Sequence, residues 1–214
     1  AYRSALPVFD VHRLCLVDTW FSSVIVVRSI LTLAELSFAA QWAVLLRSAS
    51  LAAGHSKALT ASRIVLPLIA TAEACSWNAV LTTSNLGHVA EESIWGITAA
   101  VIVVTLHGVG ARADRSAKPL YTLCIALGLA YVLYIFAVDV PMYWDRWLVD
   151  EARGRHYLTL AQGMADVSSR WVVSHRWNDW KSEVVWMSLY FSVAVWLSIG
   201  LIHVPMRRRL QQLD

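Results

Sequence analysis

Ionisable side chains inside apolar stretches are the first chemically informative feature of the sequence. Glu35 and Glu73 each lie near the middle of an apolar run, and Arg28 and Gln41 lie on either side of Glu35. Arg28 precedes Glu35 by seven residues, which is two helical turns, so the two share a helix face. Burying an ionised group in hydrocarbon costs a few kcal/mol, so such groups face the protein interior and find partners. We therefore predict that Glu35 and Glu73 face the inside of a helix bundle, with Arg28 pairing with one of them.

Two interpretations of this buried polar set stay open. An ion pair between Arg28 and a glutamate across a helix interface would fix the packing of the helices and do nothing else. Alternatively, Arg28, Glu35, Gln41 and Glu73 hold a ligand, a cofactor or a proton. The sequence identifies no cofactor.

A second group combines histidine with carboxylates, which are ligands of Zn, Fe, Mn and Cu. His88 lies three and four residues before Glu91 and Glu92, so a helix would place them on one face, and Asp139 ends a later apolar run. The chain has neither an HExxH motif nor the repeated Glu-x-x-His pair of di-iron bundles. Carboxylates at a helix start are also explained by the helix dipole. The four residues are a candidate metal site with no indicated metal.

The elements that position these residues are apolar helices. Hydrophobic residues make up 57% of the 214 residues, charged residues only 15%, and the mean hydropathy is +0.53. A soluble domain usually has about 25% charged residues. Runs of about 20 apolar residues are long enough to cross a bilayer. The sequence therefore predicts an all-α integral membrane protein, one domain over residues 1–214, with spans at about 24–46, 64–83, 93–110, 120–140 and 184–204.

Lysine and arginine predict the orientation of this five-helix bundle. Nine of them lie in the stretches 47–63, 108–118 and 205–214: Arg47, Lys57, Arg63, Arg112, Arg115, Lys118, Arg207, Arg208 and Arg209. Basic residues concentrate in the cytoplasmic connections of membrane proteins. Five spans with the N-terminus outside and the C-terminus inside place all three stretches on the inner side.

Tryptophan marks the connection 141–183, which this topology places on the outer face. We predict two short amphipathic helices there, at about 142–152 and 157–173, lying on the membrane surface. The tryptophans would lie at the headgroup level as an aromatic belt, or form a docking surface, since Trp and Arg are enriched at interfaces. They are Trp144, Trp147, Trp171, Trp177 and Trp180.

Two function classes follow from these observations. The first is a non-catalytic accessory or scaffold subunit of a larger membrane complex, for example a photosynthetic or respiratory one, which docks through its Trp-rich outer surface. The alternative is a small membrane-embedded enzyme, with or without a metal ion, acting on a lipid or lipophilic substrate at the outer face. The chain has no P-loop, GxSxG or GxGxxG motif. Its net charge of +3 and the lack of a basic face exclude nucleic acid, so the expected partners are the bilayer and other membrane subunits.

Overall fold

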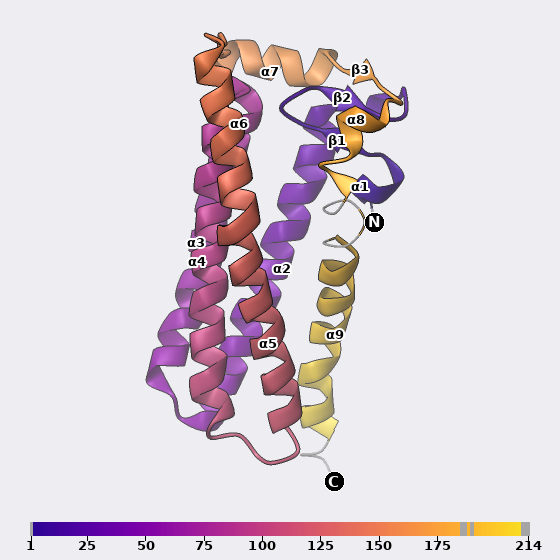
Figure 1. The fold of residues 1–214 in the computed structure, drawn as a ribbon. Coiled ribbons are helices and arrows are strands. Elements are labelled where there is room, and N and C mark those ends of the chain that lie inside the picture. Colours follow the sequence, from indigo (N-terminus) through magenta and orange to yellow (C-terminus); the bar gives the residue numbers. More distant parts are fainter. Residues whose placement is uncertain (1, 185–187, 189–190, 211–214) are drawn as a thin grey trace.

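Four long helices stand side by side in the computed structural model, which describes residues 2–184, 188 and 191–210 (Figure 1). They are α2 (Val24–Ala53), α3 (Ser56–Thr82), α4 (Asn85–Gly110), and a continuous helix made of α5 (Lys118–Tyr134), the π-helical turn η2 (Ile135–Asp139) and α6 (Val140–Ala152). Each is long and apolar enough to cross a membrane. The 26 residues of α4 alone extend about 40 Å, against a hydrocarbon core of about 30 Å.

These helices correspond to the first four predicted spans but extend beyond them, because a search for apolar runs leaves out polar ends. The helix α4 begins at Asn85, eight residues before its predicted span, and so includes the polar sequence around His88. Between α2 and α3 the reversal takes two residues. Gly54 ends α2 in the left-handed conformation, with φ of 60°, and His55 Nδ1 accepts a hydrogen bond from the Ala58 N–H at 3.2 Å at the start of α3.

A fifth helix, α9 (Phe191–Leu210), packs mainly against α2. Its described apolar part, Ser192–Ile202, is shorter than the other four helices. Ser198 Oγ donates a hydrogen bond of 2.7 Å to Gln41 Oε1, which is how Gln41 is satisfied and α9 is tied to α2. Residues 185–187 and 189–190 of the predicted span 184–204 lie outside the described residues, so the fifth crossing stays a prediction.

The predicted surface helix at about 142–152 is wrong in its placement. Instead of ending before Pro141, the fourth helix continues through η2 into α6 along the bundle axis (Figure 1). A proline lacks an N–H, and its ring crowds the carbonyl of the preceding turn. The wider π turn, in which hydrogen bonds join residues five apart, accommodates this crowding without ending the helix.

One end of the bundle is covered by a small cap. It contains α1 (Tyr2–Ala5), β1 (Val8–Phe9), β2 (Leu14–Cys15), η1 (Trp20–Ser22), α7 (Leu160–Ser169), β3 (Val172–Val173) and α8 (Trp177–Trp180). The strands form a sheet in the order β1-β2-β3, antiparallel between β1 and β2 and parallel between β2 and β3. The helix α7, within the predicted helix at 157–173, runs across the end of the bundle (Figure 1).

Arg13 fastens this cap to the bundle. Its side chain is buried and donates hydrogen bonds to Asp166 Oδ2 of α7 at 2.7 Å, to the Val80 carbonyl of α3 at 2.8 Å and to the Asp10 carbonyl at 2.5 Å. One guanidinium therefore joins the N-terminal segment to residues about 70 and 150 positions later in the chain.

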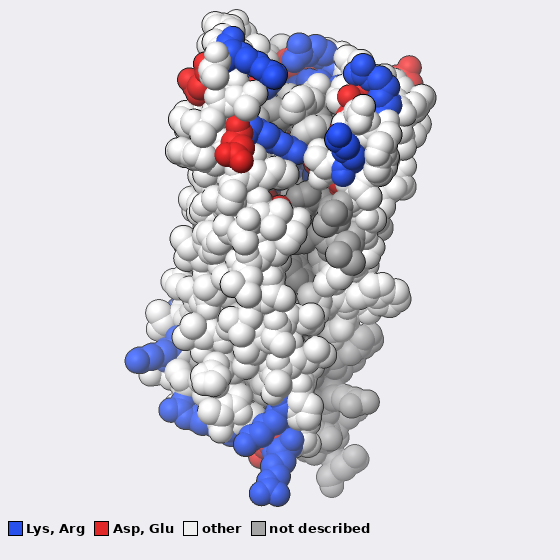
Figure 2. All heavy atoms as spheres, viewed as in Figure 1, with Lys and Arg blue, Asp and Glu red and all other residues white. Residues whose placement is uncertain are grey.

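Charge and exposure are distributed as a bilayer requires. On the face shown in Figure 2, charged side chains gather at the two ends and the middle is uncharged. Large apolar side chains are exposed between them, among them Leu33, Val104 and Leu133. Four apolar helices and this surface suit a multi-pass membrane protein.

Candidate functional site

Arg28 lies among three glutamates from three helices near the cap end of the bundle. Its Nη2 atom is 2.8 Å from Glu73 Oε2 of α3, 3.1 Å from Glu91 Oε1 of α4 and 3.6 Å from Glu35 Oε2 of its own helix. The side chains of Arg28, Glu73 and Glu91 are 4–6% exposed, whereas Glu35 is 21% exposed. One guanidinium thus serves several buried carboxylates, and we call these four residues the charged cluster.

Helical periodicity and one hydrogen-bond chain hold the charged cluster in place. Arg28, Thr32 and Glu35 recur every three or four residues on one face of α2. Thr32 Oγ1 donates to Glu73 Oε2 at 2.6 Å, and Trp77 Nε1 donates to Thr32 Oγ1 at 3.0 Å. Glu73 Oε1 and Glu35 Oε2 have no hydrogen-bond partner among the described residues.

His88 and Glu91 form a dyad beside the charged cluster. They are three residues apart on α4, and His88 Nδ1 lies 2.6 Å from Glu91 Oε2. The Tyr143 ring of α6 packs on the imidazole, with ring centroids 4.9 Å apart. A carboxylate at this position accepts a hydrogen bond from Nδ1–H, and in the neutral imidazole this tautomer leaves the lone pair on Nε2. Glu91 therefore uses one oxygen for Arg28 and the other to orient His88.

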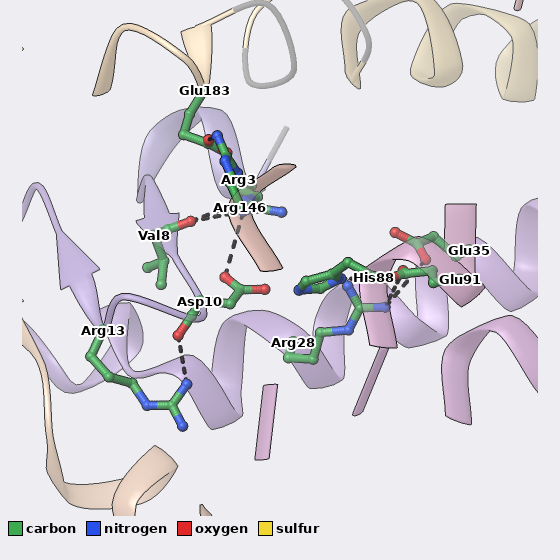
Figure 3. Close-up of polar contacts among 10 residues, drawn as sticks. All are labelled: Arg3, Val8, Asp10, Arg13, Arg28, Glu35, His88, Glu91, Arg146 and Glu183. Atoms are coloured by element: carbon green, nitrogen blue, oxygen red, sulfur yellow. Dashed lines mark hydrogen bonds and ion pairs between the residues drawn. The ribbon is translucent and has the colours of Figure 1, made fainter. Parts of the chain in front are cut away.

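The cluster and the dyad border a cavity of about 50 Å³, which we call the polar cavity. Figure 3 shows Arg28, Glu35, His88 and Glu91 on one side and residues of the cap, with Arg146 and Glu183, on the other. Aromatic rings also line it, from Phe9, Trp95 and Tyr143. The charged and ionisable residues that line it are Arg3, Asp10, Arg28, Glu35, His88, Glu91, Glu92 and Glu183.

A second, larger space adjoins the polar cavity. It has a volume of about 180 Å³, and we call it the apolar pocket. Its walls come from four helices: Phe38 and Trp42 of α2, residues 95–103 of α4, residues 124–131 of α5, and Val193, Ala194 and Leu197 of α9. Trp95 borders both spaces, and Phe38 lies one helical turn after Glu35. The polar cavity and the apolar pocket therefore have one tryptophan as a shared wall.

The four residues of the candidate metal site, His88, Glu91, Glu92 and Asp139, have different surroundings in the structure. Among the residues that the structure describes, one group of three potential ligands has donor atoms within 4.8 Å of one another, namely Glu35, Glu73 and Glu91. Glu92 lines the polar cavity, and Asp139 is fully buried at the end of η2 without lining it. A nitrogen of Arg28 already lies among the three carboxylates, so the charge that they bind in this structure is a guanidinium.

The five tryptophans of the predicted docking surface have separate environments. Trp177 is 65% exposed and Trp144 is 43% exposed, with the Trp147 ring 4.9 Å from the latter. Trp171 Nε1 donates to Asp18 Oδ1 at 3.1 Å. Trp180 is buried, and its Nε1 donates to the Ser174 carbonyl at 2.8 Å. Trp171 and Trp180 thus hold the cap together.

Sequence reasoning missed three aromatic residues of the site. Trp77 supports Thr32, Trp95 separates the two spaces, and Tyr143 packs on His88. Tyr143 follows Asp139 by four residues, a spacing that is informative once the fourth helix is known to continue through Pro141. Comparison of the chain with protein-family models, with curated proteins and with solved structures gives no match. Function must therefore be argued from the site itself.

Proposed function

We propose that the protein is a membrane-embedded enzyme that acts on the polar end of a lipophilic substrate near the outer face of the bilayer. The observation that carries this proposal is that the polar cavity and the apolar pocket lie on either side of one shared residue, Trp95. Ligand sites are typically mostly apolar, with a few placed polar groups that orient the ligand. Here the apolar part is open to a hydrocarbon chain, and the polar part contains groups that transfer protons.

His88 is the residue we assign to proton transfer. Because Glu91 holds Nδ1–H, Nε2 is the ring atom that we assign to accept or donate a proton at a substrate atom in the polar cavity. Arg28 holds Glu91 in place, because its Nη2 lies 3.1 Å from Glu91 Oε1 while the other carboxylate oxygen contacts His88. Arg28 and Glu91 are positioning residues in this scheme. Where a metal ion also takes part, Glu35, Glu73 and Glu91 are the group that would hold it.

The topology we propose keeps five spans, with α9 as the fifth and the cap outside. The helix ends and connections opposite the cap contain Arg47, Lys57, Arg63, Arg112, Arg115 and Lys118, and the positive-inside rule places this end in the cytoplasm. The polar cavity is bordered by the cap residues Phe9 and Asp10, so it lies toward the outer side.

A turnover experiment tests the proposal. The purified protein is reconstituted into vesicles made from the lipid extract of its host membrane, and the lipids are followed by mass spectrometry. The wild type should convert at least one species, and His88→Ala should slow this conversion by about 10²–10⁴-fold, the usual contribution of general acid–base catalysis. His156→Ala, at an exposed histidine of the cap, is the matched control and should convert normally. Equal turnover by His88→Ala, or none by the wild type, refutes the proposal.

Binding to the apolar pocket is tested separately. Ala99→Phe places a ring inside this pocket, whereas Val104→Phe adds the same group at a position that is 72% exposed on the lipid side. Lipophilic molecules that copurify in mild detergent should be lost from Ala99→Phe and kept by Val104→Phe. Equal copurification in both variants contradicts a substrate chain in this pocket.

The accessory-subunit function remains a second candidate, because Trp177 and Trp144 are exposed on one end of the molecule. The double change Trp177→Ala and Trp144→Ala should then release a stoichiometric partner, since hot-spot aromatics contribute about 2 kcal/mol or more each. The buried Trp180 serves as the comparison, because its replacement should loosen the cap instead. If the wild type and the double variant both purify without a partner protein, the protein does not act as a subunit.

A further inference from the structure

From the charges around the polar cavity, we infer that the polar end of the substrate is a cation, an amine or ammonium group attached to the hydrocarbon chain. This inference rests on the proposed function, because it names the class of molecule that the junction of the two spaces receives. Its basis is the balance of charge, the unused acceptor atoms, the aromatic walls and the space.

The polar cavity has more carboxylates than bases. Asp10 is paired with Arg3 at 3.5 Å, and Glu183 with Arg146 at 2.9 Å. The remaining carboxylates in and next to the cavity are Glu35, Glu73, Glu91 and Glu92, and a single guanidinium, that of Arg28, pairs with the first three. Among the described residues, Glu92 has no hydrogen bond or ion pair. Carboxylates this close in a low-dielectric site require additional positive charge or protons. An anionic headgroup would increase the imbalance, and a cationic one relieves it.

Unused acceptor atoms point to the same ligand. Glu35 lines the polar cavity, and its Oε2 lies 3.6 Å from Arg28 Nη2 without a hydrogen bond from a described residue. Glu73 Oε1 belongs to a side chain that is 4% exposed and likewise accepts no hydrogen bond from a described residue. Oxygen atoms of Glu35, Glu73 and Glu91 lie within 4.8 Å of one another, so one donor group can reach more than one of them. An ammonium group brings up to three N–H donors and a positive charge.

Aromatic walls and size distinguish an organic cation from a metal ion. Rings of Phe9 and Tyr143 already receive a cation, since the Arg146 Cζ atom lies 5.3 Å from each centroid, and Trp95 presents a further ring. About 10–15 Å³ of such space holds one water-sized group, so a cavity of about 50 Å³ holds an ammonium with its first carbons. A bare metal ion would satisfy the carboxylates but leave the adjoining apolar pocket unexplained.

Binding of octylamine, octanol and octanoate to the purified full-length protein tests the inference. The three probes share a chain and differ in headgroup charge, and each is titrated while the thermal midpoint is followed, because ligand binding raises it. Octylamine should bind at least about tenfold more tightly than octanol, and octanoate should bind least. The double change Glu35→Gln and Glu92→Gln should abolish the preference for the amine while keeping octanol binding. Asp145→Asn, at an exposed acid outside the cavity, is the charge-matched control.

The outcomes separate the two proposals. If octanol and octylamine bind equally, and Ala99→Phe weakens both, the apolar pocket is a binding site but the cationic headgroup is refuted. If no probe binds, or if Ala99→Phe changes nothing, the proposed function fails as well. Stabilisation by MgCl₂, MnCl₂ or ZnCl₂ without any preference for octylamine would assign the carboxylates to a metal ion and overturn the inference. Glu92→Gln alone repeats the test if the double variant does not fold.

Discussion

Replacing Arg28 by methionine tests whether the charged cluster behaves as one unit. The guanidinium lies 2.8 Å from Glu73 and 3.1 Å from Glu91, and these two side chains are only 4% and 6% exposed. Arg28→Met therefore leaves two buried carboxylates without their cation. Removing one partner of a buried ion pair typically costs about 3–5 kcal/mol of unfolding free energy. In a chain of this size each kcal/mol lowers the midpoint by about 2–4 °C, so we expect a decrease on the order of 10 °C.

The relative stabilities of the single, double and triple variants test this explanation. If the cost comes from uncompensated charge, neutralising the carboxylates restores stability in steps. Arg28→Met with Glu73→Gln should be more stable than Arg28→Met alone, and adding Glu91→Gln should recover more, by about 1–3 kcal/mol for each relieved group. For a simple pair between Arg28 and Glu73, the first glutamine would already restore all the stability that charge relief can give.

Thermal unfolding in mild detergent, followed by circular dichroism, measures these differences. Arg112→Met at the exposed end opposite the cap is the control and should change stability by no more than about 0.5 kcal/mol. An Arg28→Met protein as stable as the wild type, or glutamine changes that destabilise it further, would refute the view that one guanidinium compensates several buried carboxylates.

Three further predictions concern the cap, the topology and pH. Gly163→Ala should destabilise the protein by about 1–3 kcal/mol, since a Cβ there would overlap a backbone carbonyl of α3; Gly200→Ala has open space around it and should be tolerated in the same thermal assay. Cysteines introduced at the exposed positions Ser116 and Ser168 should react with an impermeant thiol reagent from opposite sides of the membrane, and labelling from one side would end the proposed topology. The hydrogen bond from Ser174 lowers the pKa of Asp179 in the cap. A lowered pKa gives stability that is present above about pH 4 and is lost as the pH falls further. The protease resistance of the cap should therefore decrease below about pH 4 in the wild type and should not do so in an Asp179→Asn variant.

Helical periodicity is the part of this molecule that the sequence predicts well. The first four apolar runs correspond to four long helices, and the seven-residue spacing of Arg28 and Glu35 places both on one side of α2. The contacts between helices could not be derived in the same way. That Arg28 reaches Glu73 and Glu91 at once depends on how three helices are arranged around it, which periodicity within one helix does not specify.

Local signals also misled where tertiary structure decides. Pro141 is a normal helix stop, but here the fourth helix continues past it, so an amphipathic segment expected on the membrane surface lies along the bundle. Trp177 and Trp180 are only three positions apart, yet Trp177 is 65% exposed and Trp180 is buried. The strands of the cap contain two residues each, too few to show an alternating pattern.

The π turn η2 has a consequence for how sequence changes act on the site. A π turn contains one residue more than an α turn over the same stretch, and one residue corresponds to about 100° of rotation around the helix. Because the π turn takes up this extra residue, the helix after η2 keeps the phase that places Tyr143 on His88 and Arg146 beside Glu183. Deleting Val138 would return the segment to α-helical spacing and leave both side chains in place, whereas deleting Met142, outside the π turn, would rotate both of them by about 100°. The site thus tolerates a change of one residue in η2, which contributes no side chain to the cavity wall, but not one closer to Tyr143.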